Sequence, residues 1–296
     1  MTFQEQYDKY RAMTEARLGE FFPGEGLAEV MRYSLLAGGK RLRPVLTLAF
    51  CAAAGGDPKA ALDFACGVEM VHTYSLIHDD LPCMDNDDLR RGKPTSHKVY
   101  GETAAILAGD ALQAAAFRTV LAAEGPWTNP AAPAQAAYVL ADAAGEKGMC
   151  LGQYWDTLGL EGPDSLEKLA QIDDKKTGDL LRAACVMGVI AAMGQGPVEP
   201  SCLEAAMGYA VNLGLAFQIQ DDLLDVTSTA EALGKPIGSD ESNGKITYVT
   251  LAGEAECRKA VVRYTVDAKT ALKAGAWRGD PAFLLELADA LTTRES

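Results

Sequence analysis

Two clusters of aspartates, each at the end of a long apolar stretch, place the strongest constraint on how this chain can fold. In the first, residues 75–91, an apolar run leads into five aspartates within ten residues and then into Arg90 and Arg91. The second, residues 221–225, follows the apolar run 210–217. A buried helix that ends in several carboxylates must open into a polar space at that end. We therefore expect a scaffold of long helices whose ends line such a space.

Periodicity and composition predict that this scaffold is helical. Alanine is abundant, β-branched and aromatic residues are sparse, and 48% of the residues are hydrophobic, which suffices for a large core. Apolar periodicity predicts helices over residues 2–20, 25–36, 44–54, 59–80, 101–123, 132–147, 165–177, 179–193, 202–224, 247–273 and 281–293. The sequence suggests no strand pair and no long linker. We expect one all-α domain over residues 1–296, a helical bundle with central helices surrounded by others.

Charge and cysteine usage narrow the class of protein. The net charge of −14 argues against nucleic acid as a partner, so an anionic substrate would need a local basic pocket or metal ions. The seven cysteines include no C-x-x-C pair, which favours buried thiols in a reducing compartment. The start of the chain lacks the pattern of a signal peptide, and the uncharged runs are short for a bilayer span. We expect a cytoplasmic protein without stable membrane insertion.

Spacing around the first cluster predicts a helix end that opens into a loop. His72, Ser75 and Asp79 are three and four residues apart, so they share one helix face. Asp85 lies six residues after Asp79, and Pro82 can end the helix and let Asp85 turn back. A solvated acidic turn is the alternative. It is disfavoured because the cluster follows an apolar helix and leads into the basic stretch 90–94.

The second cluster predicts a site for a divalent cation. Gln218, Asp221 and Asp225 share one helix face, and the apolar residues before them are expected to be buried. Two like charges about 6 Å apart repel each other by roughly 3 kcal/mol at an effective dielectric constant near 20. A hard cation such as Mg²⁺ removes this repulsion and also binds substrate phosphates. The alternative is a set of helix-end charges paired with surface lysines.

Basic residues that could meet an anion occur in four places. They are Lys40 with Arg43, Arg90 with Arg91, Lys175 with Lys176, and Lys235 with Lys245. Each could instead be an ordinary solvated charge. The last pair is the better candidate because glycines surround it and allow the backbone to approach an anion. Arginine suits bidentate contact with phosphate.

Taken together, these motifs resemble the trans-isoprenyl diphosphate synthase family, in particular its bacterial farnesyl and geranylgeranyl members. The resemblance covers about residues 30–250. The matching residues are Gly38 to Pro44, His72 to Pro94 with D-D-x-x-x-x-D at Asp79, Asp80 and Asp85, Gly109-Asp110, Gly152-Gln153, Lys176-Thr177, Gln218 with Asp221, Asp222 and Asp225, and Gly234-Lys235 to Gly244-Lys245.

The resemblance implies an all-α fold around a central substrate cavity, with the two aspartate motifs facing each other across its mouth. It implies that several Mg²⁺ ions are held by Asp79, Asp80, Asp85, Asp221 and Asp225. The allylic diphosphate would be bound by Arg90, Lys176, Lys235 and Lys245, and isopentenyl diphosphate by Lys40, Arg43, His72 and Arg91. Thr177 and Gln218, with Lys176, would lie at the reacting centre. Asp87 and Asp88 receive no role. A homodimer is also implied.

The expected reaction is a Mg²⁺-dependent head-to-tail condensation of isopentenyl diphosphate with an allylic diphosphate. In this family a bulky residue five positions before the first aspartate is associated with a short product, so Tyr74 favours farnesyl diphosphate. The small Ser75 leaves geranylgeranyl diphosphate open. The rivals are a terpene cyclase, a catalytically silent regulatory subunit and a structural helical protein. Lys40, Arg43 and Arg91 argue against the cyclase, and the two intact aspartate motifs argue against the silent subunit.

Overall fold

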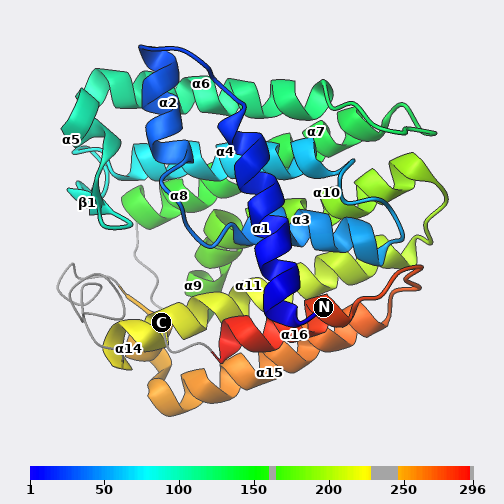
Figure 1. Ribbon diagram of the computed structural model, residues 1–296. Coiled ribbons are helices and arrows are strands. Elements are labelled where there is room, and N and C mark those ends of the chain that lie inside the picture. Colours follow the sequence, from blue (N-terminus) through cyan, green and yellow to red (C-terminus); the bar gives the residue numbers. More distant parts are fainter. Residues whose placement is uncertain (160–164, 228–245, 294–296) are drawn as a thin grey trace. The chain divides into compact units, whose positions relative to one another are not determined.

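The computed structural model describes residues 1–159, 165–227 and 246–293, and it confirms an all-α fold (Figure 1). Contacts divide the chain into two compact units, which are described separately. Unit 1 comprises residues 1–141, 183–198 and 278–280, and unit 2 comprises the described residues among 142–182, 199–277 and 281–296. The expectation of a single domain over residues 1–296 stays a prediction.

The helices of unit 1 pack around α4, which ends at the first aspartate motif. They are α1 (Phe3–Gly19), α2 (Leu27–Leu35), α3 (Leu42–Ala53), α4 (Leu62–Asp79), the short α5 (Ser96–Tyr100) and α6 (Glu102–Leu121). Helices α4 and α6 lie side by side (Figure 1). Their approach depends on Gly67, because a Cβ there would lie 2.4 Å from a methyl group of Val120. Close helix packing thus explains a glycine in the middle of α4.

A short hairpin in unit 1 shows that the expectation of no strand pair was wrong. Strands β1 (Leu89–Arg90) and β2 (Lys93–Pro94) pair antiparallel. Their two-residue turn, Arg91-Gly92, has φ values of +54° and +73°. Positive φ at both positions is the pattern of a type I′ turn, which matches the twist of a hairpin. Two-residue strands carry too little periodicity to be found from sequence.

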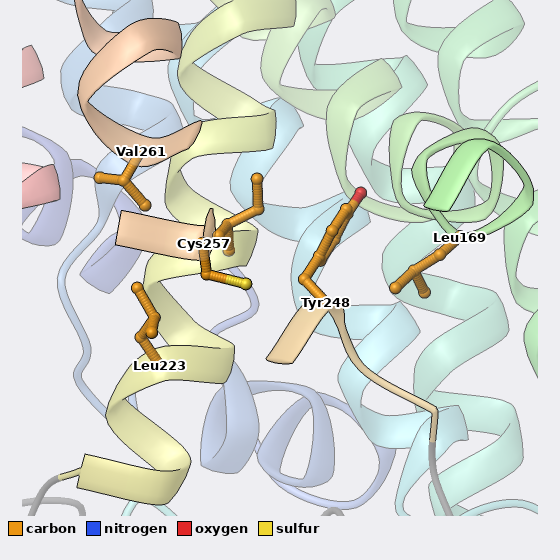
Figure 2. Packing of buried hydrophobic residues seen from close by; sticks show 6 residues of the cluster. Leu169, Leu223, Tyr248, Cys257 and Val261 are labelled. Atoms are coloured by element: carbon orange, nitrogen blue, oxygen red, sulfur yellow. The ribbon is translucent and has the colours of Figure 1, made fainter. Parts of the chain in front are cut away.

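Unit 2 is built on α11 (Ser201–Thr227), which packs along α15 (Glu254–Lys273). Its other elements are α8 (Met149–Leu158), α9 (Leu166–Asp173), the π-helical segment η1 (Asp174–Gly178), α14 (Tyr248–Ala252) and α16 (Ala282–Thr292). Helix α7 (Ala132–Ala144) and helix α10 (Asp179–Gln195) each contribute residues to both units. Figure 2 shows part of the unit 2 core, where Tyr248 lies between Leu169 and Cys257.

The predicted elements of unit 2 differ from the observed ones at three places. Helix α8 was missed. The predicted break at residue 178 is instead a π-helical segment that joins α9 to α10. The predicted helix over residues 247–273 divides at Gly253, whose φ of +79° ends α14 before α15 begins.

Among the described residues, three helical stretches are long and apolar enough to cross a membrane by length and composition alone. They are α6, the continuous run Leu166–Gln195 and α11. In the run Leu166–Gln195, 72% of the most apolar window is buried within the structure. Burial in a protein core accounts for the apolar character of that run.

Candidate active site

The first aspartate motif lies where α4 ends and the chain turns back. Helix α4 stops at Asp79, and the backbone N–H of Asp85 donates to the Asp79 carbonyl over 2.8 Å. The bond closes a turn that contains Pro82 and returns Asp85 to the helix end. Asp80 is buried, Asp79 is half-buried and Asp85 is exposed. The structure therefore gathers the three residues at one end of α4, as their spacing predicts.

Asp80 is paired with Arg90 on strand β1. Two guanidinium nitrogens of Arg90 lie 2.7 Å and 2.6 Å from Asp80 Oδ1. Burial raises the pKa of Asp80, and the hydrogen bond from Arg90 acts against that rise. The pair joins a residue predicted to hold metal to a residue predicted to bind the allylic diphosphate.

The two aspartates without a predicted role help to shape the hairpin. The Asp87 carbonyl accepts a hydrogen bond from Thr95 Oγ1 over 2.8 Å. The Asp88 carboxylate lies 2.6 Å from Lys98 Nζ, and its carbonyl accepts the Thr95 N–H over 3.0 Å. These contacts fix the base of the hairpin that carries Arg90 and Arg91.

His72 lies within electrostatic reach of several arginines. Burial lowers the pKa of His72 well below its ordinary value of 6.5, and Arg43 and Arg91 act in the same direction. Burial also lowers the pKa of Arg43 to about 10, and the charge of Arg91 adds to that lowering while Glu69 opposes it. The structure thus brings together three of the four residues predicted to bind isopentenyl diphosphate, in a region of concentrated positive charge.

The fourth residue of that set, Lys40, is exposed in the loop before α3. Arg91 reaches this loop and donates a hydrogen bond to the Gly38 carbonyl. Gly39 has a φ of +120°, which favours glycine, and a Cβ there would lie 2.6 Å from the Arg91 guanidinium carbon. The glycines of the matched motif therefore allow the hairpin and the loop to meet.

The two residues predicted to set product length lie on different faces of α4. Tyr74 is buried and packs edge-to-face on His78, with ring centroids 5.7 Å apart. His78 Nε2 lies 3.1 Å from the Ile106 carbonyl of α6, and a Cβ on Gly109 would overlap that imidazole. Tyr74 therefore lies on the α6 side of the helix. Ser75, whose hydroxyl donates to the His72 carbonyl, shares the face of Asp79.

In unit 2, Lys176 and Thr177 lie in the π-helical segment η1. Insertions of this kind are frequent at functional sites. Lys176 Nζ lies 2.5 Å from Asp156 of α8. The backbone of Lys176 passes so close to α8 that a Cβ on Gly152 would lie 2.2 Å from the Lys176 nitrogen. Gly152 of the matched Gly-Gln pair thus permits the contact between α8 and η1.

The second aspartate motif lies near the C-terminal end of α11. Asp221 is half-buried, and Asp222 and Asp225 are buried. The Asp222 carboxylate accepts the backbone N–H of Tyr248 over 2.8 Å and so anchors the start of α14. Burial raises the pKa of the Tyr248 hydroxyl, and the neighbouring Asp173 carboxylate adds to that rise. The structure therefore gives Asp222 a structural contact, whereas Asp221 and Asp225 were the residues predicted to hold metal.

The carboxylates fit a divalent cation by their chemistry. Within residues 1–159, 165–227 and 246–293, no three carboxylate, thiol or imidazole groups converge closely enough to hold a metal ion alone. Mg²⁺ commonly takes one or two carboxylates together with water and substrate phosphates. Asp79 and Asp80 at one helix end, and Asp221 and Asp225 on one face of α11, suit that kind of binding. Lys235 and Lys245 lie outside the described residues.

Three residues near the site were missed by sequence reasoning. Glu69 is buried in α4, Asp156 pairs with Lys176, and Tyr248 links α14 to Asp222. Glu69 could have been found from the sequence, because a lone carboxylate in the apolar stretch of α4 is expected to be buried with a partner. The contacts of Asp156 and Tyr248 depend on tertiary packing.

Comparisons with known proteins converge on one family. The sequence profile described as "Polyprenyl synthetase" matches residues 25–273. Geranylgeranyl pyrophosphate synthase 3, chloroplastic, of Arabidopsis thaliana is 52% identical over 228 residues, which is 76% of this chain and 62% of that protein. The chain thus spans less than two thirds of that relative. Farnesyl diphosphate synthase of Geobacillus stearothermophilus is 47% identical over 233 residues, which is 78% of this chain and 77% of that protein.

The fold agrees with these sequence matches. A crystal structure described as geranyltransferase from Helicobacter pylori complexed with magnesium and isoprenyl diphosphate superposes with a TM-score of 0.82 at 31% identity. The superposition covers 97% of this chain and 96% of that one.

Proposed function

This chain belongs to the polyprenyl synthetase family, and from that premise we propose that it condenses isopentenyl diphosphate with an allylic diphosphate to make farnesyl diphosphate. The observation that supports this most is that Arg90, which precedes Arg91, pairs with Asp80 of the first aspartate motif, while Arg91 and Arg43 both lower the pKa of His72. A chain with a net charge of −14 that concentrates guanidinium groups in one region is suited to bind a phosphorylated substrate there.

We assign the two diphosphates to different sets of residues. Isopentenyl diphosphate is bound by Lys40, Arg43, His72 and Arg91. The neutral form of His72, favoured by its lowered pKa, can donate one hydrogen bond and accept another. The allylic diphosphate is bound by Arg90, Lys176, Lys235 and Lys245.

The aspartates of both motifs are proposed to hold magnesium, through Asp79, Asp80, Asp85, Asp221 and Asp225. The Helicobacter pylori relative, which carries magnesium and isoprenyl diphosphate, supports this choice of metal. When bound, magnesium would neutralise charge on the departing diphosphate.

The reaction breaks the C1–O bond of the allylic diphosphate, and the electron pair of that bond leaves with the diphosphate. The double bond of isopentenyl diphosphate then attacks the allylic C1, and the released diphosphate accepts the proton lost from C2 of the isopentenyl unit. Arg90 and Lys176 stabilise the leaving group electrostatically. Thr177 and Gln218 line the space beside the allylic carbon. The protein positions the two substrates and excludes water that would quench the cation.

A coupling assay tests this function. Purified protein receives Mg²⁺, labelled isopentenyl diphosphate and, separately, dimethylallyl, geranyl or farnesyl diphosphate, and the products are sized after dephosphorylation. We expect a Mg²⁺-dependent product that stops at fifteen carbons. A twenty-carbon product would instead identify a geranylgeranyl diphosphate synthase. Folded protein that incorporates no label with any starter would favour a silent regulatory subunit.

We assign product length to Tyr74, which is buried on α4 five residues before Asp79. We expect Tyr74→Ala to extend the product beyond fifteen carbons, because it removes an aromatic ring from the predicted floor of the cavity. Ser75→Ala is the matched control, since it removes only a hydroxyl group. Identical product lengths from Tyr74→Ala and the unmodified protein would refute this assignment.

We further propose that the protein is a cytoplasmic homodimer. Leu107 and Leu121 lie on one face of α6 and are 51% and 56% exposed. Exposed apolar side chains on one face of a long helix are suited to pack against a second copy.

A further inference from the structure

The loop that carries Lys40 and Arg43 has an unfavourable backbone conformation. Gly38, Gly39 and Arg41 have φ values of +88°, +120° and +52°. Glycine tolerates such values, but for arginine the left-handed region is disfavoured by contact between Cβ and the backbone. A conformation of this kind persists only where the surrounding structure holds it.

A buried ion pair holds Arg41 in place. Its Nη1 donates to Glu69 Oε1 over 2.7 Å, and its Nη2 donates to the Leu35 carbonyl over 2.7 Å. The two side chains are 1% and 2% exposed. Glu15 of α1 lies 3.8 Å from the Arg41 Nε. Loss of one partner of a buried pair leaves the other charge uncompensated, so Arg41 depends on Glu69.

A second contact holds the residue before Arg41. The hydroxyl of Tyr7, on α1, donates to the Lys40 carbonyl over 2.6 Å. Burial raises the pKa of Tyr7 to about 12, and Glu69 adds to that rise, so the hydroxyl remains a donor at neutral pH. The loop is therefore held from α1 by Tyr7 and from α4 by Glu69.

We propose that Glu69, acting through Arg41, is a positioning residue that orients Lys40 and Arg43 toward the diphosphate of isopentenyl diphosphate. This inference rests on the proposed function for the identity of that substrate. The inward turn of Arg41 leaves Lys40 exposed and places Arg43 beside His72 and Arg91. If the loop relaxes, the cations that bind one substrate lose their arrangement, whereas the residues assigned to the allylic diphosphate are unaffected.

The test compares Glu69→Gln with Asp63→Asn. The first variant removes the charge that holds Arg41 but keeps a side chain of similar shape. The control breaks an ion pair that joins α1 to α4 without involving the loop, in which Arg17 Nε lies 2.8 Å from Asp63 Oδ1. We expect Glu69→Gln to raise the KM for isopentenyl diphosphate by about tenfold, with the KM for geranyl diphosphate and kcat changed by less than about twofold. Asp63→Asn should leave both KM values unchanged.

Tyr7→Phe keeps the inference testable if Glu69→Gln does not fold, because it leaves the buried ion pair intact. It removes only the hydrogen bond to Lys40 and should raise the same KM by about threefold. Equal changes in the two KM values, or no change in a folded variant, would overturn the inference.

Titration calorimetry with inorganic diphosphate separates this inference from the proposed function. If the unmodified protein binds diphosphate but couples no isopentenyl diphosphate, the proposed function fails. Weaker diphosphate binding by Glu69→Gln than by Asp63→Asn would still support the positioning of the loop, and equal binding would refute it.

Discussion

Arg41 and Arg91 show how two arginines in one basic region serve different purposes. Arg41 is buried against Glu69, whereas Arg91 is exposed and reaches the Gly38 carbonyl. Both have positive φ values, an unusual conformation for a residue other than glycine. Arg41 is part of the loop before α3 and holds its conformation, whereas Arg91 contacts the same loop from the hairpin.

His72 should make stability depend on pH. Its pKa in the folded protein lies below the ordinary value of 6.5, so the unfolded chain binds a proton more readily between the two values. The stability that the protein has with His72 neutral is therefore fully present above pH 6.5 and is lost as the pH falls toward the pKa of His72 in the folded protein. Lowering the pH from 7.5 to 5.5 should reduce the free energy of unfolding by at most about 1.4 kcal/mol more in the unmodified protein than in His72→Gln.

Urea unfolding of both proteins at the two pH values measures this difference. The aspartates titrate in both proteins, so the comparison isolates the histidine. Equal losses of stability in the two proteins would contradict the prediction.

Sequence spacing predicted part of the site and could not predict the rest. The positions of His72 and Asp79 on α4, and the return of Asp85, follow from helix periodicity and from a proline, which are local properties. The ion pair between Asp80 and Arg90 could not be foreseen, because it depends on a hairpin formed by two-residue strands.

At the scale of elements, the predicted helices differ most from the structure at α8 and η1, which contact each other. The predicted helices did not include α8, which packs against η1 where Gly152 lets the backbone of Lys176 approach. The fold class and most of the other helices were predicted, because long amphipathic or apolar runs are a strong sequence signal for helix. Short helices and local π-helical turns are decided by their neighbours.

Gly152→Ala should separate α8 from η1. The new methyl group would meet backbone atoms of Lys176 at 2.2 and 2.6 Å, and backbone cannot move aside easily. We expect the free energy of unfolding to fall by about 1–3 kcal/mol, with a higher KM for the allylic substrate, because Lys176 is displaced.

Gly214→Ala on α11 is the matched control, measured by the same urea unfolding and steady-state kinetics. A Cβ there has its nearest neighbours at 3.5 and 3.6 Å, an ordinary contact. This variant should gain up to about 1 kcal/mol from helix propensity. A Gly152→Ala protein as stable as Gly214→Ala would show that α8 and η1 can move apart without cost.

At the scale of the whole molecule, the net charge of −14 contrasts with the basic region around His72. The excess of acidic residues repels anions in general, so the proposed diphosphate substrate would depend on the local guanidinium groups for binding. The two compact units divide the proposed machinery. Unit 1 holds the first aspartate motif and the isopentenyl diphosphate residues, and unit 2 holds the second motif with Lys176, Thr177 and Gln218.

The proposed homodimer gives a prediction at this scale. Leu107→Glu should convert the dimer to a monomer, because it places a charge in the proposed apolar interface on α6. Size-exclusion chromatography with light scattering would report the mass. Val262→Glu is the control, since Val262 on α15 is 64% exposed and lies outside that face. Unmodified protein with the mass of one chain at micromolar concentration would refute the dimer.

The hairpin turn at Arg91-Gly92 also bears on how this protein could be engineered. A type I′ turn favours asparagine at its first central position, so arginine there is a poor choice for the turn itself. Selection for thermostability alone would tend to replace Arg91 with asparagine and discard a cation that the proposed chemistry needs. At position 91, directed evolution for stability would therefore favour asparagine, whereas directed evolution for turnover would favour arginine.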